Sequence, residues 1–233
     1  MCPAAKFSPA EQESMILEAA AEVIEQSSLM DFTMSAIAKK AGISMGSIYK
    51  HVQTKEDVLI ALDVMLLKRE LVTYRKLQPL ELTTPEKLIS CFLLDYQKTN
   101  LHSFDVQLGM LVGNEAILKR GSVAWVERMR QGGKELCGFF DEILNQAVNR
   151  KELTLPDHNP DELYQLNTGL WALNVGNLRV SLEGCNGYMP KFAPDCAQIL
   201  NTKRFINSFH WSQPLDTEGL DKVCHLLGEI GLR

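Results

Sequence analysis

Residues 32–55 read FTMSAIAKKAGISMGSIYKHVQTK and differ in charge from the chain around them. The segment contains four lysines and no acidic residue, whereas the 233-residue chain has a formal net charge of −5 at pH 7. A basic segment that persists inside an acidic protein indicates contact with an anionic partner.

The same segment predicts two short helices joined by a tight turn. Thr33 can cap the first helix, and Gly42 can end it because glycine readily adopts left-handed backbone angles. Ser44 can then cap the second helix. The apolar residues that would hold the pair together are Ile37, Ala38, Ala41, Ile43 and Ile48. A small residue at Ala38 facing Gly42 should allow close approach of the helices, which is typical of a helix-turn-helix.

In a helix-turn-helix the second helix lies in the major groove of DNA, so its outward residues face the bases. The outward residues here are Ser44, Met45, Ser47, Tyr49 and Lys50. Thr54 begins the next helix and would aim its N-terminus, with Lys55 beside it, at a phosphate. A surface hairpin with solvated lysines is the simpler interpretation. We favour DNA contact because the turn, the caps and the missing acids coincide.

Helix signals recur along the rest of the chain. Ser8-Pro9, Thr84-Pro85 and Asn159-Pro160 each place a capping side chain before a proline, and Thr54 with Asp57 supplies another start. Apolar residues follow at helical spacing, no segment alternates as a strand would, and about nine or ten helices are expected. The sequence therefore predicts an all-α protein.

Composition excludes several other classes of protein. The chain is 45% hydrophobic and 23% charged, as in an ordinary globular protein of one or two domains. No apolar stretch is long enough for a membrane span, and the acids at Glu11, Glu13 and Glu18 do not suit a signal peptide. We expect a cytoplasmic protein without membrane contact.

The sequence contains no motif for catalysis or for metal binding. Its six cysteines are scattered without a C-x-x-C pair, and its five histidines have no metal-ligand spacing. Gly-x-Ser-x-Gly, phosphate-binding glycine loops and H-E-x-x-H are also absent. We therefore expect no enzyme activity, no metal and no cofactor.

The run FTMSAIAKKAGISMGSIYKHVQTKEDVL, residues 32–59, resembles the DNA-binding signature of the tetracycline-repressor (TetR) family, and the resemblance extends over residues 8–62. It implies an all-helical homodimeric transcription regulator with an N-terminal DNA-binding domain and a divergent domain for a small effector and dimerisation. The residues that the resemblance places on DNA are Thr33, Ser44, Gly46, Ser47, Tyr49, Lys50, His51 and Lys55. Met45 and Val52 depart from the family pattern, where a basic residue or proline and an aromatic residue are usual.

Residues 163–178 contain no charge, and apolar residues recur in them at spacings of three and four. This pattern favours a dimer interface over a helix buried in its own subunit, given that the family dimerises through late helices. The interface residues that we expect are Leu163, Leu166, Leu170, Leu173, Asn177 and Val180. Gly169, Ala172 and Gly176 form a second face that would let another helix backbone come close.

An effector pocket is expected among aromatic and methionine residues of the C-terminal region, although ordinary core packing explains them equally well. The candidates are Met110, Trp125, Met129, Phe140, Asn167, Trp171 and Asn174.

The expectation is thus a homodimeric regulator with two domains, in which residues 1–60 bind operator DNA and residues 61–233 dimerise and bind an effector. A repressor released from a palindromic operator by a small molecule fits best. The alternatives are a helix-turn-helix used for protein interaction, and an all-α ligand carrier or enzyme without effector-controlled DNA binding.

Overall fold

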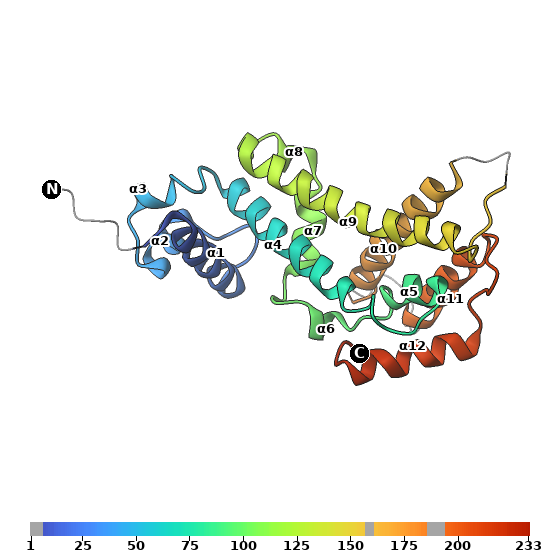
Figure 1. The fold of residues 1–233 in the computed structure, drawn as a ribbon. Coiled ribbons are helices and arrows are strands. Elements are labelled where there is room, and N and C mark those ends of the chain that lie inside the picture. Colours follow the sequence, from blue (N-terminus) through green and yellow to red (C-terminus); the bar gives the residue numbers. More distant parts are fainter. Residues whose placement is uncertain (1–6, 157–160, 186–193) are drawn as a thin grey trace. The chain divides into compact units, whose positions relative to one another are not determined.

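The computed structural model describes residues 7–156, 161–185 and 194–233, in which helices are joined by turns and loops (Figure 1). The helices are α1 (Pro9–Gln26), α2 (Met34–Ala41), α3 (Met45–Ile48), α4 (Lys55–Arg75), α5 (Thr84–Ser90), α6 (Tyr96–Thr99), α7 (Asp105–Val112), α8 (Glu115–Leu118), α9 (Val123–Asn149), α10 (Glu162–Cys185), α11 (Pro194–Ile206) and α12 (Thr217–Glu229). Within the described ranges, β-structure is limited to one isolated antiparallel bridge between Leu153 and Trp211. The predicted all-α class is confirmed. The helices outnumber the expectation because single turns such as α6 and α8 are too short to show periodicity.

The predicted helix starts agree with the structure except in one detail. Ser8 caps α1 and exchanges a capping box with Glu11, as its spacing indicates. The side chain of Thr54 accepts a 2.9 Å hydrogen bond from the Asp57 N–H and so caps α4. The cap of α5 is Thr83 rather than Thr84, because Thr84 donates its hydroxyl to Glu152 at 2.6 Å. Asn159-Pro160 lies outside the described residues.

The chain divides into two compact units, which differ from the expected division at residue 60. The first unit contains the described residues of Met1–Arg69 and Asn100–Lys134, and the second contains those of Glu70–Thr99 and Glu135–Arg233. Both α4 and α9 contribute residues to each unit. The helix-turn-helix segment therefore shares a unit with α7, α8 and the first part of α9.

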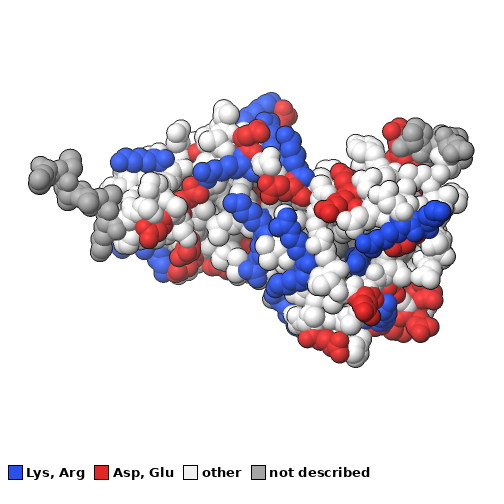
Figure 2. Space-filling view, in the orientation of Figure 1, with Lys and Arg blue, Asp and Glu red and all other residues white. Residues whose placement is uncertain are grey.

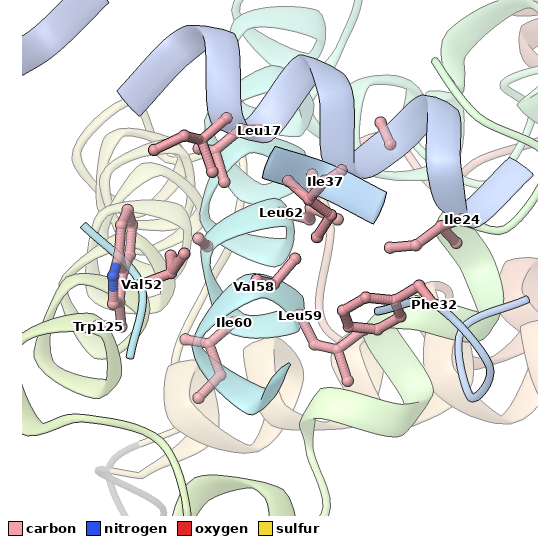
Figure 3. Packing of buried hydrophobic residues seen from close by; sticks show 14 of the residues in the cluster. Leu17, Ile24, Phe32, Ile37, Val52, Val58, Leu59, Ile60, Leu62 and Trp125 are labelled. Atoms are coloured by element: carbon pink, nitrogen blue, oxygen red, sulfur yellow. The ribbon is translucent and has the colours of Figure 1, made fainter. Parts of the chain in front are cut away.

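The core of the first unit joins the N-terminal helices to α4 and α9. Figure 3 shows Leu17 of α1, Ile37 of α2 and Val58 of α4 in one cluster, with Trp125 of α9 beside Val52 at its edge. Ile37, Ile48, Val58 and Ile60 are completely buried. Removal of so many apolar side chains from water makes this unit a single packed body rather than a tethered hairpin.

The second unit has its own core, built from α5, α10, α11, α12 and the second part of α9. Leu144, Leu166, Ile206, Val223 and Leu227 are each completely buried there. Gly169 lets α11 approach α10, since a Cβ at this position would collide with the ring of Phe205. The close approach expected of the small-residue face is thus made by a side chain of the same subunit. Gly176 has nothing within 4 Å of its hypothetical Cβ.

None of the helices in the described part of the chain is long and apolar enough to span a membrane.

Candidate nucleic-acid interface

The turn between α2 and α3 has the geometry that the sequence indicates, with one change in the role of its glycine. Gly42 ends α2 with φ = 67° in the left-handed region, and the Ile43 N–H donates to the Ala38 carbonyl at 3.2 Å. A Cβ on Gly42 would have nothing within 4 Å. Gly42 is therefore needed for its backbone conformation and not for close contact between the helices.

The caps of both short helices are serine or threonine hydroxyls, as predicted. The Thr33 hydroxyl oxygen accepts from the Ala36 N–H at 3.1 Å, and the Ser44 oxygen accepts from the Ser47 N–H at 3.1 Å. The hydroxyl groups of Ser44 and Ser47 also lie 3.1 Å apart. Thr33 and Ser44 thus fix the first turns of α2 and α3, and both remain exposed to solvent.

The outward surface of α3 combines exposed polar groups with one large aromatic side chain. Tyr49 is 47% exposed, and Lys50 and Gly46 are also exposed. Met45 differs from the expectation, because it is half-buried and packs against the core of the first unit. Gly46 has only the Ser44 Oγ within 4 Å of a hypothetical Cβ, so a partner can approach the backbone closely there.

The lysines of the segment divide into free and engaged groups. Lys55 donates to the Met30 carbonyl at 2.9 Å, and its ammonium lies 4.6 Å from the centre of the Phe32 ring. Lys40 forms an ion pair with Glu22 of α1. Lys50 makes neither kind of contact within the described structure. Lys50 is therefore the lysine best placed for an external phosphate, whereas Lys55 mainly holds the start of α4 on the preceding loop.

Three groups at or just before the start of α9 attach it to His51 and to the first part of α4. The indole N–H of Trp125 donates to the His51 carbonyl at 2.8 Å, and the Ser122 N–H donates to the Asp57 carboxylate at 2.6 Å. A Cβ on Gly121 would collide with Ile60, so this loop lies directly against α4. The His51 ring faces Gln12 of α1, with Nε2 3.4 Å from Oε1. His51 is thus engaged with α1 and α9, which the sequence did not indicate.

An isolated acidic group is buried in the same unit. Asp63 of α4 is 7% exposed, and no described residue donates a hydrogen bond to its carboxyl group. A Cβ on Gly109 of α7 would lie 3.9 Å from its Oδ1. Burial alone raises the pKa of Asp63 to about 7. Its charge is therefore sensitive to pH near neutrality.

The expected effector-pocket residues fall in both units. Met110, Trp125 and Met129 belong to the first unit, and Trp125 and Met129 pack into its core. Phe140, Asn167 and Asn174 belong to the second, where Asn174 accepts a 3.3 Å hydrogen bond from the Tyr96 hydroxyl and Asn167 donates to Asp141 at 2.6 Å. Trp171 is 68% exposed.

The expected interface residues of α10 include two corrections. Leu166 is completely buried and Leu170 is 5% exposed, because both pack into the core of the second unit. Leu163, Leu173 and Asn177 are half-buried, and Val180 is 39% exposed. Besides Val180, the large exposed apolar residues in the described part of this helix are Tyr164 at 72%, Trp171 at 68% and Val175 at 44%. The charge-free pattern could not tell which side of this helix faces its own core.

No group of three or more His, Cys, Asp or Glu in the described ranges is arranged to hold a metal ion.

The N-terminal helices define a helix-turn-helix protein: a capped α2, a left-handed glycine turn and a short α3 with exposed polar groups. Residues 16–62 match the family model for bacterial regulatory proteins of the tetR family. Residues 16–62 of this chain are therefore similar to the DNA-binding segment of the TetR family, as the sequence indicated. No curated protein matches this sequence.

Solved structures extend the likeness of fold over most of the chain. FadR from Bacillus subtilis in complex with stearoyl-CoA has a TM-score of 0.56 at 19% identity, covering 84% of this chain and 99% of that chain. A TetR regulator from Haloarcula marismortui has a TM-score of 0.62 at 16% identity, covering 86% of this chain and 98% of that chain. A regulator from Saccharomonospora viridis in complex with choline has a TM-score of 0.60 at 16% identity, covering 84% of this chain and 96% of that chain. The chain thus has the fold of TetR-type transcription regulators.

Proposed function

We propose that this protein is a homodimeric transcription regulator that binds an inverted-repeat operator and is released from it by a small-molecule effector, acting as a repressor. The observation that carries the proposal is the exposed surface of α3. Tyr49, Lys50 and Gly46 lie together on a helix-turn-helix whose residues 32–55 contain no acid. Such a surface suits the edges of bases and the phosphates beside them.

Charge distribution favours recognition by geometry over general attraction to DNA. Figure 2 shows basic and acidic side chains interspersed on the face that it displays, and the chain as a whole is acidic. Long-range attraction to the phosphate backbone is weak for such a protein. Specific contacts of α3, including Ser47, and of Thr33 at the start of α2 then have to supply much of the affinity.

Dimerisation through α10 and α11 is supported by the exposed apolar residues of these helices. Tyr164, Trp171 and Val175 recur along α10 at spacings of seven and four, and Leu200 of α11 is 48% exposed. Large apolar side chains exposed along one helix indicate a surface that a partner covers. Two helices from each of two copies would form a four-helix interface. Leu163, Leu173, Asn177 and Val180 are its proposed margins.

The dimer proposal is tested by Trp171→Glu, measured by sedimentation equilibrium. A charge in the buried centre of the interface should convert the dimer to a monomer. The matched control is Val123→Glu, because Val123 is 85% exposed but lies in the first unit. A variant at Trp171 that dimerises as tightly as the control would contradict this interface.

An effector site is best supported in the aromatic cluster of the second unit. The Tyr74 ring centre lies 5.5 Å from that of Phe140 and 6.4 Å from that of Phe139. Burial raises the pKa of both Tyr74 and Tyr96, and the nearby charge of Glu70 raises each pKa further. The hydroxyl of Tyr96 reaches Asn174. An apolar site with a few polar groups is the usual design for a small ligand, and two regulators of this fold are complexes with stearoyl-CoA and choline.

Selection of bound fragments from random duplex DNA tests the function. The wild-type protein should enrich an inverted repeat with half-sites about one helical turn apart, or a multiple of it. A Tyr49→Ala/Lys50→Ala variant should enrich nothing. Its control is Lys39→Ala, which removes a lysine of α2 and keeps the α3 surface. Absence of enrichment by the wild type, in the presence and absence of cell extract as an effector source, would favour the protein-interaction alternative.

A further inference from the structure

The first turn of α9 makes contacts with two parts of the helix-turn-helix that are far from it in sequence. The Trp125 indole N–H donates to the His51 carbonyl at 2.8 Å, three residues beyond the end of α3. Arg128 Nη1 lies 2.9 and 3.0 Å from the two carboxylate oxygens of Glu13 in α1. The Arg128 guanidinium also lies 4.3 Å from the centre of the Trp125 ring. The two anchors therefore support each other.

These contacts complete a ring of interactions around the end of α3. The His51 side chain approaches Gln12 of α1, and the neighbouring Val52 is buried beside Trp125 (Figure 3). Trp125 itself is 4% exposed. The buried Trp125 ring thus holds the backbone carbonyl of His51, which directly follows Tyr49 and Lys50 in the chain.

We propose that Trp125 and Arg128 are positioning residues for DNA recognition, which hold the end of α3 against α1 at the angle that operator binding requires. This inference rests on the proposed DNA-binding function. It assigns a role in recognition to the start of α9, outside residues 16–62 that match the family model. Since α9 continues as one helix to Asn149, it also offers a route by which events elsewhere on the chain reach α3.

Trp125→Phe tests the proposal because it keeps an aromatic ring and removes only the indole donor and part of the packing. The chain offers a matched control in Trp211→Phe. Trp211 is 7% exposed, and its indole N–H donates to the Ile206 carbonyl at 2.7 Å in the second unit. The two substitutions remove the same kind of bond and should lower stability to a similar degree.

Operator affinity should distinguish the two variants. Trp125→Phe is expected to weaken operator binding about tenfold while affinity for scrambled DNA changes less than about twofold, and Trp211→Phe is expected to change neither. Equal operator affinities for the two variants would overturn the proposal. The slope of log affinity against log salt should stay at its wild-type value, since no phosphate contact is removed.

Arg128→Gln, with Arg130→Gln as its control, tests the second anchor. Arg130 is on the same helix, and within the described residues its one interaction is an exposed ion pair with Glu127. Arg128→Gln should weaken operator binding about threefold at an unchanged salt slope, whereas Arg130→Gln should have no effect. A lower slope for Arg128→Gln would mean that Arg128 itself contacts phosphate, which would overturn the positioning role.

Hydrogen exchange of the free protein separates this inference from the proposed function. Amide exchange of residues 49–52 should be at least about tenfold faster in Trp125→Phe than in Trp211→Phe, with α2 unchanged. If the protein selected no operator but this difference appeared, the DNA-binding function would fail while the positioning of α3 stood. If exchange were unchanged, the positioning role would fail whatever DNA the protein binds.

Discussion

The Ser122 N–H donates a 2.6 Å hydrogen bond to Oδ1 of Asp57, although the two residues are 65 positions apart. The other oxygen of this carboxylate accepts from the Gln53 N–H at 2.8 Å. Asp57 is completely buried. One side chain therefore joins the start of α4 to the start of α9 within the first unit.

Asp57→Ala should destabilise the protein by about 2 to 4 kcal/mol, because two backbone N–H groups lose a buried carboxylate as their acceptor. Urea unfolding followed by circular dichroism measures the change. Asp31→Ala, at an exposed acid of the same unit, should stay within about 0.5 kcal/mol of the wild type. Similar losses for the two variants would show that the Asp57 junction contributes little.

Asp63→Asn should stabilise the protein at high pH and leave it nearly unchanged at low pH. Burial raises the folded-state pKa of Asp63 from 3.8 to about 7, so the folded state holds a proton that the unfolded chain releases. The contribution of Asp63 to stability therefore falls as pH rises through this window. A difference of one between the folded and unfolded pKa corresponds to about 1.4 kcal/mol. Ionised Asp63 therefore lowers the free energy of unfolding by on the order of 4 kcal/mol at pH values above its folded pKa.

The measurement is the unfolding free energy of wild type and Asp63→Asn at several values of pH. The difference between them should grow from below the unfolded pKa to the folded pKa and then level off. A difference that is independent of pH would show that Asp63 stays ionised in the folded protein.

Substitution by alanine should lower stability at Gly42 of the turn and should lower DNA affinity at Gly46 of α3. Gly42→Ala places a Cβ on a residue with φ = 67° and should cost about 1 kcal/mol or more of stability, measured by thermal unfolding. The methyl group that Gly46→Ala adds points into open space on a helix, so this substitution should not destabilise the protein. It should instead weaken operator binding at least about tenfold, because the backbone can no longer approach DNA. Unchanged operator affinity in Gly46→Ala would remove Gly46 from the interface.

Local signals in the sequence are sufficient to predict the helix-turn-helix. The cap at Thr33, the left-handed Gly42 and the cap at Ser44 each depend on residues within four positions, and all three agree with the structure. Contacts between distant segments are not accessible in this way. Nothing in the periodicity of α9 indicates that Trp125 bonds to His51, since helical spacing reports only which residues share a face.

The same limit explains the corrections on α10. Leu166, Leu170, Leu173 and Val180 all belong to the apolar pattern of α10. The core of the second unit buries Leu166 and Leu170 but leaves Val180 exposed. An apolar stripe looks the same whether its own subunit or a partner buries it. The sequence places Trp171 in a pocket because aromatic residues suit both roles, whereas its exposure favours the interface.

Lysines that are free in the structure should dominate the salt dependence of DNA binding. Lys50→Ala should reduce the slope of log affinity against log salt by about 2 for a dimer, at about 0.9 for each phosphate that the lysine neutralises. Lys40→Ala should change it little, since Lys40 is paired with Glu22. Fluorescence anisotropy of a labelled operator at several salt concentrations gives both slopes. Equal reductions would show that the Lys40 pair opens on DNA.

The proposed function requires above all that residues 32–55 read DNA sequence. This is tested by the ratio of dissociation constants for the scrambled duplex and for the selected duplex of equal length, measured at about 150 mM salt. Sequence reading by α3 predicts a ratio of at least about 1,000 for the wild type, falling towards about 1 for Tyr49→Ala/Lys50→Ala. A wild-type ratio close to about 1, or a high ratio that survives in the double variant, would contradict it.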